Sequence, residues 1–225
     1  LGTNTTSTTV DASGSTGAVI MTSATTAALT YTGSTSIDTL TVGTNAVAET
    51  INLGAGNDKV TFTANMLVTD VVDGGDGTDT LVSTMAIMDV LDASGTANMN
   101  VSNMEVLEVS DDLAATLTTQ NVQAGIASVH LAEGGTGTVI GPAGDLTVTI
   151  GNPLTGTVTL TDTGTGTTDS VSISSSSLTA EAWAANQAVT TSGYETLNIS
   201  TTTPSGTATD QQFGIITVGS DTGGS

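Results

Sequence analysis

Three segments of the chain combine glycine and aspartate in a pattern that suits cation binding. Gly74–Leu81 reads GGDGTDTL, Leu53–Val60 reads LGAGNDKV, and Gly33–Leu40 reads GSTSIDTL. In each segment an aspartate stands sixth and an aliphatic residue stands eighth. Glycine allows the tight turns and positive φ that let carbonyl oxygens converge, and the aspartate adds a charged oxygen. Ligand sets made only of oxygen favour calcium over zinc or copper, so the pattern indicates calcium loops.

The spacing of the three aspartates predicts which loops work together. Asp38, Asp58 and Asp79 follow one another at intervals of 20 and 21 residues. Calcium takes about six to eight oxygens, so one loop provides half a site and two loops must stack. At Asp38 the central glycines are missing, and a simple β-turn is the favoured interpretation there. The candidate ligands are Asp58, Asn57, Gly56 and Gly54 in one loop, Asp79, Gly77, Asp76, Gly75, Gly74 and Asp73 in the next, and Asp38 as a third aspartate.

Two other polar groups give weaker signals. His130 stands in an alternating apolar segment without a nearby second His, and the chain has no Cys, so a structural or exposed histidine is the favoured interpretation. The acidic residues Glu105, Glu108, Asp111 and Asp112 lie close together in the sequence. A solvated turn is favoured there over a second cation site.

The charge of the chain also indicates cations. It has 225 residues, of which 22 are Asp or Glu and only one, Lys59, is Lys or Arg, so its formal net charge is −21. Such a surface cannot neutralise phosphates, which excludes nucleic-acid binding, and it is repelled by anionic membranes. The absence of cysteine excludes disulfide scaffolds and thiolate metal sites. No run of 18 apolar residues is present, so we expect no membrane insertion. No catalytic constellation is visible, and we expect no enzyme activity.

The elements that must position these loops are short β-strands. Apolar residues alternate with Thr and Ser in bursts such as Leu146–Ile150 and Val158–Leu160, and Gly, Asp and Asn separate the bursts. Alternation with period two indicates strands with one buried face. Because the strands are short and only five residues are aromatic, we predict an all-β chain folded as a parallel β-solenoid of about twenty residues per coil. One short helical insertion is predicted near residues 178–188. Residues 1–160 are predicted to form the calcium-stabilised solenoid, and residues 161–225 a continuing β-rich segment.

Internal repeats are consistent with a solenoid. Val10–Gly14 reads VDASG and Leu91–Gly95 reads LDASG. Met104–Val109 reads MEVLEV and Tyr194–Ile199 reads YETLNI, which share an apolar or aromatic residue, a glutamate and alternating apolar positions. Five-residue matches can arise by chance in so biased a composition, and the second pattern is the more specific of the two. Together they favour a repeat architecture.

With Gly74–Leu81 followed by Met104–Val109, the chain resembles the RTX-type S-layer proteins of Gram-negative bacteria and the related large RTX adhesins. Gly74–Leu81 matches the calcium-binding RTX nonapeptide pattern in full. The resemblance implies a roll of β-strands of the RTX type, type I secretion, calcium-dependent folding at the bacterial cell surface and assembly into a lattice or extracellular fibre. Neighbouring copies of the chain are then the expected partners, with cell-surface polysaccharide as a candidate anchor. Leu53 departs from the pattern because it replaces a motif glycine, and the array of loops is short.

Four functions are compatible with the sequence. The first is a structural, self-assembling segment of a surface protein. The second is a calcium-stiffened extender or binding repeat of a secreted adhesin, and the third is the non-catalytic RTX tail of a secreted enzyme. Ice binding is the fourth, but it needs threonine rows of constant period, and these are not evident in the sequence.

Overall fold

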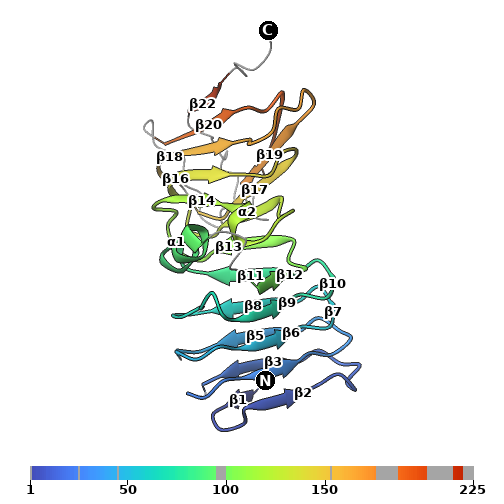
Figure 1. Cartoon of the computed structure of the whole chain (residues 1–225). Helices are drawn as coiled ribbons and strands as arrows, with labels where there is room; N and C mark the ends of the chain where they lie inside the picture. The colour runs from blue at the N-terminus through green and yellow to red at the C-terminus, as the bar shows by residue number, and fades with distance from the viewer. Residues whose placement is uncertain are drawn as a thin grey trace, which may run out of the picture. The chain divides into compact units, whose positions relative to one another are not determined.

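The computed structural model describes residues 2–24, 26–44, 46–94, 100–152, 154–175, 187–201 and 215–219. Within them the chain is built from short parallel strands that stack coil upon coil, and this confirms the predicted parallel β-solenoid (Figure 1). It divides into two compact units, residues 1–107 with 121–123 and residues 108–120 with 124–225. The predicted division between residues 160 and 161 falls inside strand β18 (Leu154–Thr161) of the second unit.

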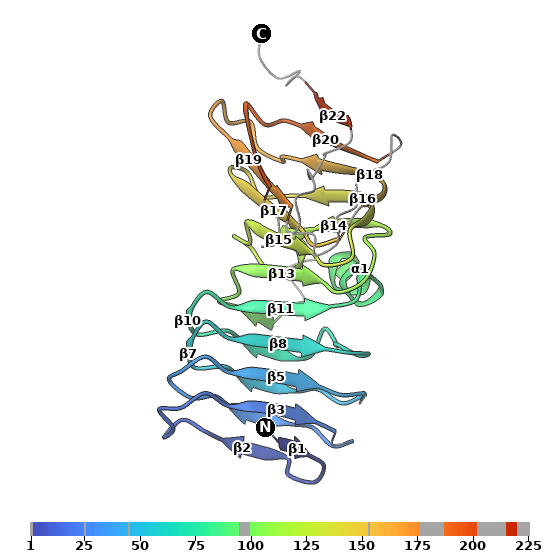
Figure 2. The same ribbon diagram turned by 180° about the vertical axis from the view of Figure 1, so that it is seen from behind.

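The first unit is made of two parallel sheets and a short third pairing. One sheet contains, in spatial order, β1 (Gly2–Asn4), β3 (Ile20–Ser23), β5 (Thr39–Val42), β8 (Lys59–Phe62) and β11 (Thr80–Ser83). The other contains β2 (Thr9–Asp11), β4 (Thr30–Thr32), β6 (Thr50–Asn52), β9 (Val71–Asp73) and β12 (Asn100–Ser102). The two-residue strands β7 (Ala55–Gly56) and β10 (Asp76–Gly77) pair with each other along one edge (Figure 2).

Rows of aliphatic side chains form the core of this unit. Thr39, Lys59 and Thr80 are direct partners in neighbouring strands, so the next residues, Leu40, Val60 and Leu81, stack in one buried row. Coil lengths of 20 and 21 residues therefore preserve the register. A parallel strand alternates its faces, and this is why threonine lies between the buried aliphatic residues.

The second unit repeats this design with coils of unequal length. Its first sheet orders β15 (Ser128–Leu131), β17 (Leu146–Ile150), β19 (Ser170–Ser175) and β21 (Thr196–Thr201). Its second sheet orders β14 (Thr116–Thr118), β16 (Gly135–Ile140), β18, β20 (Ala188–Ser192) and β22 (Ile215–Val218). Strand β13 (Val106–Val109) and the one-turn helix α2 (Thr119–Val122) lie where the chain passes between the units.

A helix that the sequence analysis did not predict interrupts the first unit. Helix α1 (Met85–Ser94) buries four apolar side chains, Met85, Ile87, Met88 and Leu91. The carbonyl of Thr84, just before the helix, accepts the amides of Ile87 and Met88. VDASG and LDASG therefore do not mark equivalent parts of two coils, because the first is strand and turn while Leu91–Ser94 of the second end α1.

The predicted helix at residues 178–188 lies outside the described residues, except for its last two positions. Of these, Ala188 begins strand β20.

Candidate cation-binding loops

The two glycine-rich loops of the first unit stack directly on one another. The pairing of β7 with β10 sets Asp76 opposite Ala55 and Gly77 opposite Gly56. The amide of Asp76 donates to the carbonyl of Gly54 at 3.0 Å. The structure therefore brings together the two predicted half-sites, and the intervals of 20 and 21 residues are coil lengths as expected.

Glycine is required in these loops because the stacked backbones touch. Gly75 and Gly77 have φ of 94° and 145°, in the region that favours glycine. A Cβ added at Gly75 would lie 1.9 Å from the carbonyl oxygen of Gly54, and one added at Gly77 would lie 1.5 Å from that of Gly56. A larger residue at either position would force the two coils apart.

The motif aspartates form a ladder of hydrogen bonds from one coil to the next. Asp58 Oδ1 accepts the amide of Asp38 at 2.6 Å, and Asp79 Oδ1 accepts the amide of Asp58 at 2.7 Å. The ladder continues at both ends, where Asp38 accepts the amide of Val19 and Glu105 accepts the amide of Asp79, each at 2.7 Å. One oxygen of each carboxylate thus accepts a hydrogen bond that joins two neighbouring coils.

The second carboxylate oxygen distinguishes Asp38 from the other two aspartates. Asp38 Oδ2 accepts the amide of Ser34 at 2.6 Å and the Tyr31 hydroxyl at 3.3 Å, and the Ser34 hydroxyl donates to Oδ1 at 2.8 Å. By contrast, Asp58 Oδ2 and Asp79 Oδ2 are buried and have no hydrogen-bond partner among the described residues. A buried polar atom without a partner is costly, so these two oxygens call for a ligand.

The local sequence explains this difference. The residue four positions before the aspartate is Ser34 in the first loop, but Gly54 and Gly75 in the next two. The Ser34 amide donates to Asp38 Oδ2, whereas no described group donates to Oδ2 of Asp58 or Asp79, where glycines with positive φ turn the loop backbone differently. The fully bonded Asp38 has no oxygen left over, whereas Asp58 and Asp79 each have one.

Burial and mutual repulsion make the two aspartates difficult to ionise. Burial raises the pKa of Asp58 to about 6, the charges of Asp79 and Asp38 add to the rise, and the hydrogen bond from the Asp38 amide opposes it. The pKa of Asp79 is raised by burial and then by the charges of Glu105, Asp73 and Asp76, against the hydrogen bond from the Asp58 amide. A cation beside these oxygens would lower both pKa values.

The remaining predicted ligands lie around this pair in different roles. Asp73 Oδ1 accepts the amide of Gly75 at 3.2 Å and the side-chain amide of Asn103 at 2.7 Å. Asn57 Oδ1 accepts the amide of Thr78 at 3.1 Å, and Asp76 is exposed. These side chains are therefore bonded within the chain or solvated. The unpartnered Oδ2 atoms of Asp58 and Asp79 are the stronger candidates for cation ligands.

Glu49 and Asp70 form a second carboxylate ladder that the sequence analysis missed. Glu49 Oε2 accepts the amide of Leu29 at 2.6 Å, and Asp70 Oδ1 accepts the amide of Glu49 at 2.8 Å. Asp70 Oδ2 accepts the amide of Leu67 at 2.8 Å, so both of its oxygens are bonded. The intervals of 20 and 21 residues between Leu29, Glu49 and Asp70 match those of the motif aspartates. This spacing is visible in the sequence and could have identified the second ladder.

The repeat of Met104–Val109 at Tyr194–Ile199 is structural. Glu105 Oε2 accepts the amide of Asp79 at 2.7 Å, and Glu195 Oε2 accepts the amide of Asp169 at 2.8 Å. In both places the carbonyl of the aspartate accepts the amide of the glutamate and of the residue after it. The glutamate is thus a coil-to-coil acceptor in each unit.

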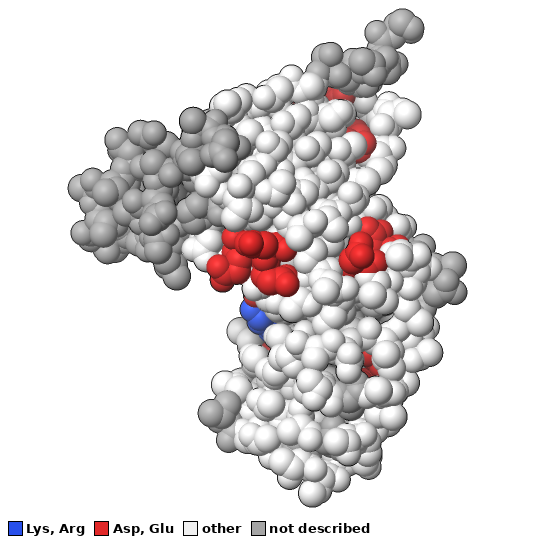
Figure 3. Space-filling model, turned by 90° about the vertical axis from the view of Figure 1, so that its left-hand side faces the viewer, with Lys and Arg blue, Asp and Glu red and all other residues white. Residues whose placement is uncertain are grey.

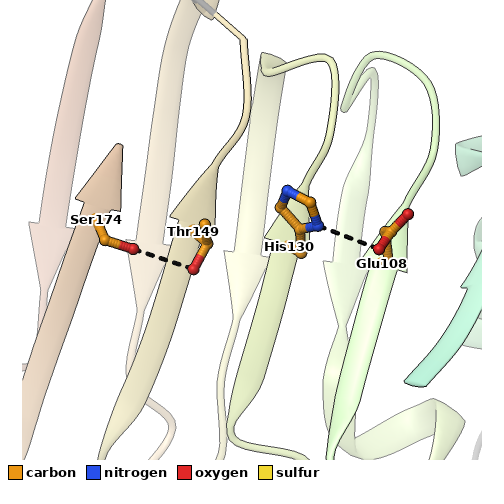
Figure 4. Close-up of polar contacts among 4 residues, drawn as sticks. All are labelled: Glu108, His130, Thr149 and Ser174. Carbon is orange, nitrogen blue, oxygen red and sulfur yellow. Dashed lines mark hydrogen bonds and ion pairs between the residues drawn. The ribbon is translucent and has the colours of Figure 1, made fainter. Parts of the chain in front are cut away.

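The only histidine takes part in a polar row on the second unit. His130 Nδ1 lies 3.2 Å from Glu108 Oε2, and the hydroxyls of Thr149 and Ser174 are 3.0 Å apart in the strands beyond (Figure 4). Thr149 is therefore bonded to Ser174 rather than to the histidine ring. Within the described residues, this row shows no hydroxyl bonded to His130 that would act as an activated nucleophile.

Acidic side chains gather in a few patches on the face seen in Figure 3, while most of that face is uncharged. In the part of the chain that the structure describes, no three Asp, Glu, His or Cys side chains converge as a ready metal centre. A cation at the glycine loops would therefore be held by the two aspartates together with backbone, amide or water oxygens, a mixture that calcium accepts.

Comparisons with known proteins do not assign the chain to a family. No family model, no curated protein and no solved structure matched it. None of the described helices is long and apolar enough to cross a membrane. The stacked glycine loops are therefore the feature that indicates a function.

Proposed function

We propose that the chain is a calcium-stabilised structural segment of a bacterial surface protein. The observation that carries this proposal is the pair of buried, unpartnered oxygens, Asp58 Oδ2 and Asp79 Oδ2, in two stacked glycine loops. A hard divalent cation would supply the missing partner to both and offset their repulsion. Calcium suits such a set because it accepts irregular oxygen ligands and does not demand the octahedral geometry of magnesium.

Calcium would couple folding of the chain to its location. Without the ion, the coil that joins the two loops contains carboxylates that are buried and close to one another. A ligand that binds only the folded chain stabilises it by about 2.7 kcal/mol at a hundred times its dissociation constant. The chain would then remain loose in a low-calcium cytosol and order after export. Type I secretion and a cell-surface location fit this behaviour and belong to the proposal.

Self-assembly is the second part of the proposed function. A formal charge of −21 makes copies of the chain repel one another, and divalent cations between acidic patches would reverse that repulsion. Neighbouring copies are the proposed partners, in a surface lattice or fibre, and surface polysaccharide is a candidate anchor. The competing assignment is an extender of a secreted adhesin, in which the same calcium loops would stiffen a monomeric rod.

Circular dichroism and electron microscopy of the full chain, with millimolar calcium and with chelator, test both parts. We expect calcium to increase strand content and to produce ordered sheets or filaments. Monodisperse rods in calcium would favour the extender. If the chelator changed neither the spectrum nor the assembly, the calcium assignment would be wrong.

Asp79→Ala and Asp38→Ala are the matched variants for the loops. Asp79 has an oxygen without a partner, whereas both oxygens of Asp38 are bonded within the chain. Asp79→Ala should therefore weaken the calcium response more strongly than Asp38→Ala. If Asp38→Ala weakened the calcium response more strongly, the assignment of the site to the stacked glycine loops would be wrong.

A further inference from the structure

An acidic corner in the second unit resembles the first site in charge but not in sequence pattern. Asp162 directly follows strand β18, and Asp169 directly precedes strand β19. Asp145 precedes β17 and Glu195 precedes β21. The amides of Asp169 and Ser170 donate to Glu195 and Asp145, and the charge of Asp162 also acts on Asp169. The four residues therefore lie at one corner of the second unit, although no three of their carboxylates converge as a ready metal centre among the described residues.

Asp162 is the buried member of this corner. Only 9% of its surface is exposed, and its Oδ1 accepts the amide of Gly144 through a long contact of 3.3 Å. Its Oδ2 is buried and has no hydrogen-bond partner among the described residues. A Cβ added at Gly164 would lie 2.9 Å from Asp162 Oδ2, and one added at Gly193 would lie 3.0 Å from the Asp162 Cβ. The unpartnered oxygen therefore lies in a tight turn, and the charge of Asp162 contributes to the raised pKa of Asp169.

The hydroxyl of Tyr194 is a second buried atom without a partner. Tyr194 is 4% exposed, and its hydroxyl makes no hydrogen bond with any described residue. A Cβ added at Gly141 would lie 2.9 Å from this hydroxyl, and the amide of Gly141 donates to Thr161, the residue before Asp162, so the hydroxyl lies near the turn of Asp162. Burial and then the charges of Asp162 and Asp169 raise the pKa of Tyr194. A buried tyrosine hydroxyl normally finds a partner. The two unpartnered atoms, Asp162 Oδ2 and the Tyr194 hydroxyl, thus lie near the same turn of the described chain.

The chain has no basic side chain to neutralise this corner. Its only Lys or Arg is Lys59 in the first unit, and His130 in the second unit contacts Glu108. Asp145 and Glu195 each commit one oxygen to the backbone, through the amides of Ser170 and Asp169. The pKa of Asp169 is raised by loss of solvent and then by its acidic neighbours. The corner therefore carries negative charge that no described group of the chain offsets.

We propose that a hard divalent cation, with calcium as the expected ion, binds between Asp162 and Asp169 with the Tyr194 hydroxyl as a neutral oxygen beside it. The cation would satisfy Asp162 Oδ2 and the hydroxyl together and would bridge the turn after β18 to the start of β19. Backbone oxygens and water would complete the shell. This site is separate from the glycine loops of the first unit, so either site can exist without the other.

Terbium luminescence tests the site because terbium replaces calcium and is excited through a nearby aromatic ring. The chain has two tyrosines, Tyr31 and Tyr194, and one tryptophan, Trp183. In the full chain with Tyr31→Phe and Trp183→Phe, emission sensitised by tyrosine reports only on Tyr194. We expect saturable emission that calcium displaces. Asp162→Asn in this background should weaken terbium binding about tenfold or more, because a charged ligand is lost.

Two matched variants complete the test. Glu133→Gln removes an equal charge from an exposed turn of the same unit, where Glu133 contacts Asn152, and it should bind terbium with unchanged affinity. Asp79→Asn should also leave the emission from Tyr194 intact, which separates this site from the glycine loops. Asp169→Asn replaces Asp162→Asn if circular dichroism shows that the latter does not fold. Absence of sensitised emission in the background chain would overturn the proposal. Unchanged affinity in the folded Asp162→Asn or Asp169→Asn variant would overturn it as well.

Discussion

The Asp38 loop and the Asp79 loop occupy the same place in successive coils but satisfy their carboxylates differently. Asp38 receives the Ser34 amide and hydroxyl and the Tyr31 hydroxyl, so its charge is bonded entirely within the chain. Asp79 receives one amide, from Asp58, and its other oxygen is buried with no partner among the described residues. One loop is complete without a ligand and the other is not, although both use an aspartate to join coils. The difference depends on serine or glycine four positions before the aspartate.

The largest expected effect comes from removing the unpartnered oxygen. Asp79→Asn keeps an oxygen for the Asp58 amide but removes the buried charge. In chelator the variant should be as stable as the natural chain or more stable, because an uncompensated buried charge is gone. In saturating calcium it should be less stable by about 2–3 kcal/mol, since the stabilisation by bound ion is lost. Urea unfolding of the variant and the natural chain, in chelator and in calcium, measures whether their order of stability reverses.

Asp89→Asn is the control for that prediction. Asp89 is an exposed acidic residue of helix α1, so the variant has the same charge change without touching the loops. It should shift stability by less than about 0.5 kcal/mol in either condition. A loss of calcium response in Asp89→Asn as large as in Asp79→Asn would point to general charge screening instead of a site.

The pH dependence of stability should reverse between chelator and calcium. The pKa of Asp58 is raised to about 6, whereas an unfolded aspartate titrates near about 3.9. The folded chain therefore binds more protons between these two values, so in chelator stability is highest at the acidic end and falls as pH rises through about 6. The loss should be about 2 kcal/mol. Calcium favours the ionised carboxylate, and in its presence stability should rise over the same range.

Asp58→Asn provides the control for the pH series, measured as urea unfolding in chelator. Asparagine keeps an acceptor for the Asp38 amide and does not titrate. The fall in stability between about pH 4 and about pH 7 should therefore be much smaller in this variant. An equal fall in both chains would assign the titration to other acidic residues.

Removing the Ser34 hydroxyl should weaken the first loop, although Asp38 Oδ2 keeps its partners. Ser34→Ala deletes the donor to Asp38 Oδ1 but keeps the backbone amide bond to Oδ2. The free energy of unfolding in chelator should fall by about 1–2 kcal/mol, because a buried carboxylate loses a hydrogen bond. Ser36→Ala, which removes an exposed hydroxyl bonded to Thr16, is the matched control and should cost less. Equal losses would show that Asp38 does not depend on Ser34.

The smallest expected effects are those of the two tyrosine hydroxyls. Tyr31→Phe removes a long hydrogen bond of 3.3 Å to Asp38, and it should cost about 0.5–1 kcal/mol. Tyr194→Phe removes a hydroxyl that has no partner among the described residues, so in chelator it should be neutral or stabilising. Thermal unfolding of both variants compares them directly. A clear loss of stability in Tyr194→Phe under chelator would mean that its hydroxyl is already satisfied.

The sequence predicted the fold because the spacing of a few residues was regular. Intervals of 20 and 21 residues between aspartates are coil lengths, and alternating threonine and aliphatic residues are the two faces of each strand. Helix α1 was missed because VDASG and LDASG look alike in a biased composition. The apolar spacing from Met85 to Leu91 and the absence of the strict alternation seen in the strands were the evidence against a coil there.

The candidate sites were less predictable, since they depend on which donors surround each oxygen. The motif identified Asp58 and Asp79, but only the structure shows that Asp38 is complete and that the other two aspartates each have an oxygen without a partner. The corner of Asp162 and Tyr194 was not predicted at all. The coils there are 25 and 26 residues long, whereas the sequence predicted coils of about twenty residues. Residues 32 positions apart in the sequence then meet at one turn.

A crystal structure of the chain grown in calcium, with an anomalous difference map, tests the central claim most directly. The account predicts an anomalous peak at the stacked glycine loops, about 2.3–2.6 Å from Asp58 Oδ2 or Asp79 Oδ2. The Asp38 carboxylate should keep its bonds to Ser34 and Tyr31 and have no peak beside it. Two glycine loops without a peak, with both oxygens bonded to water or to the protein, would contradict the account.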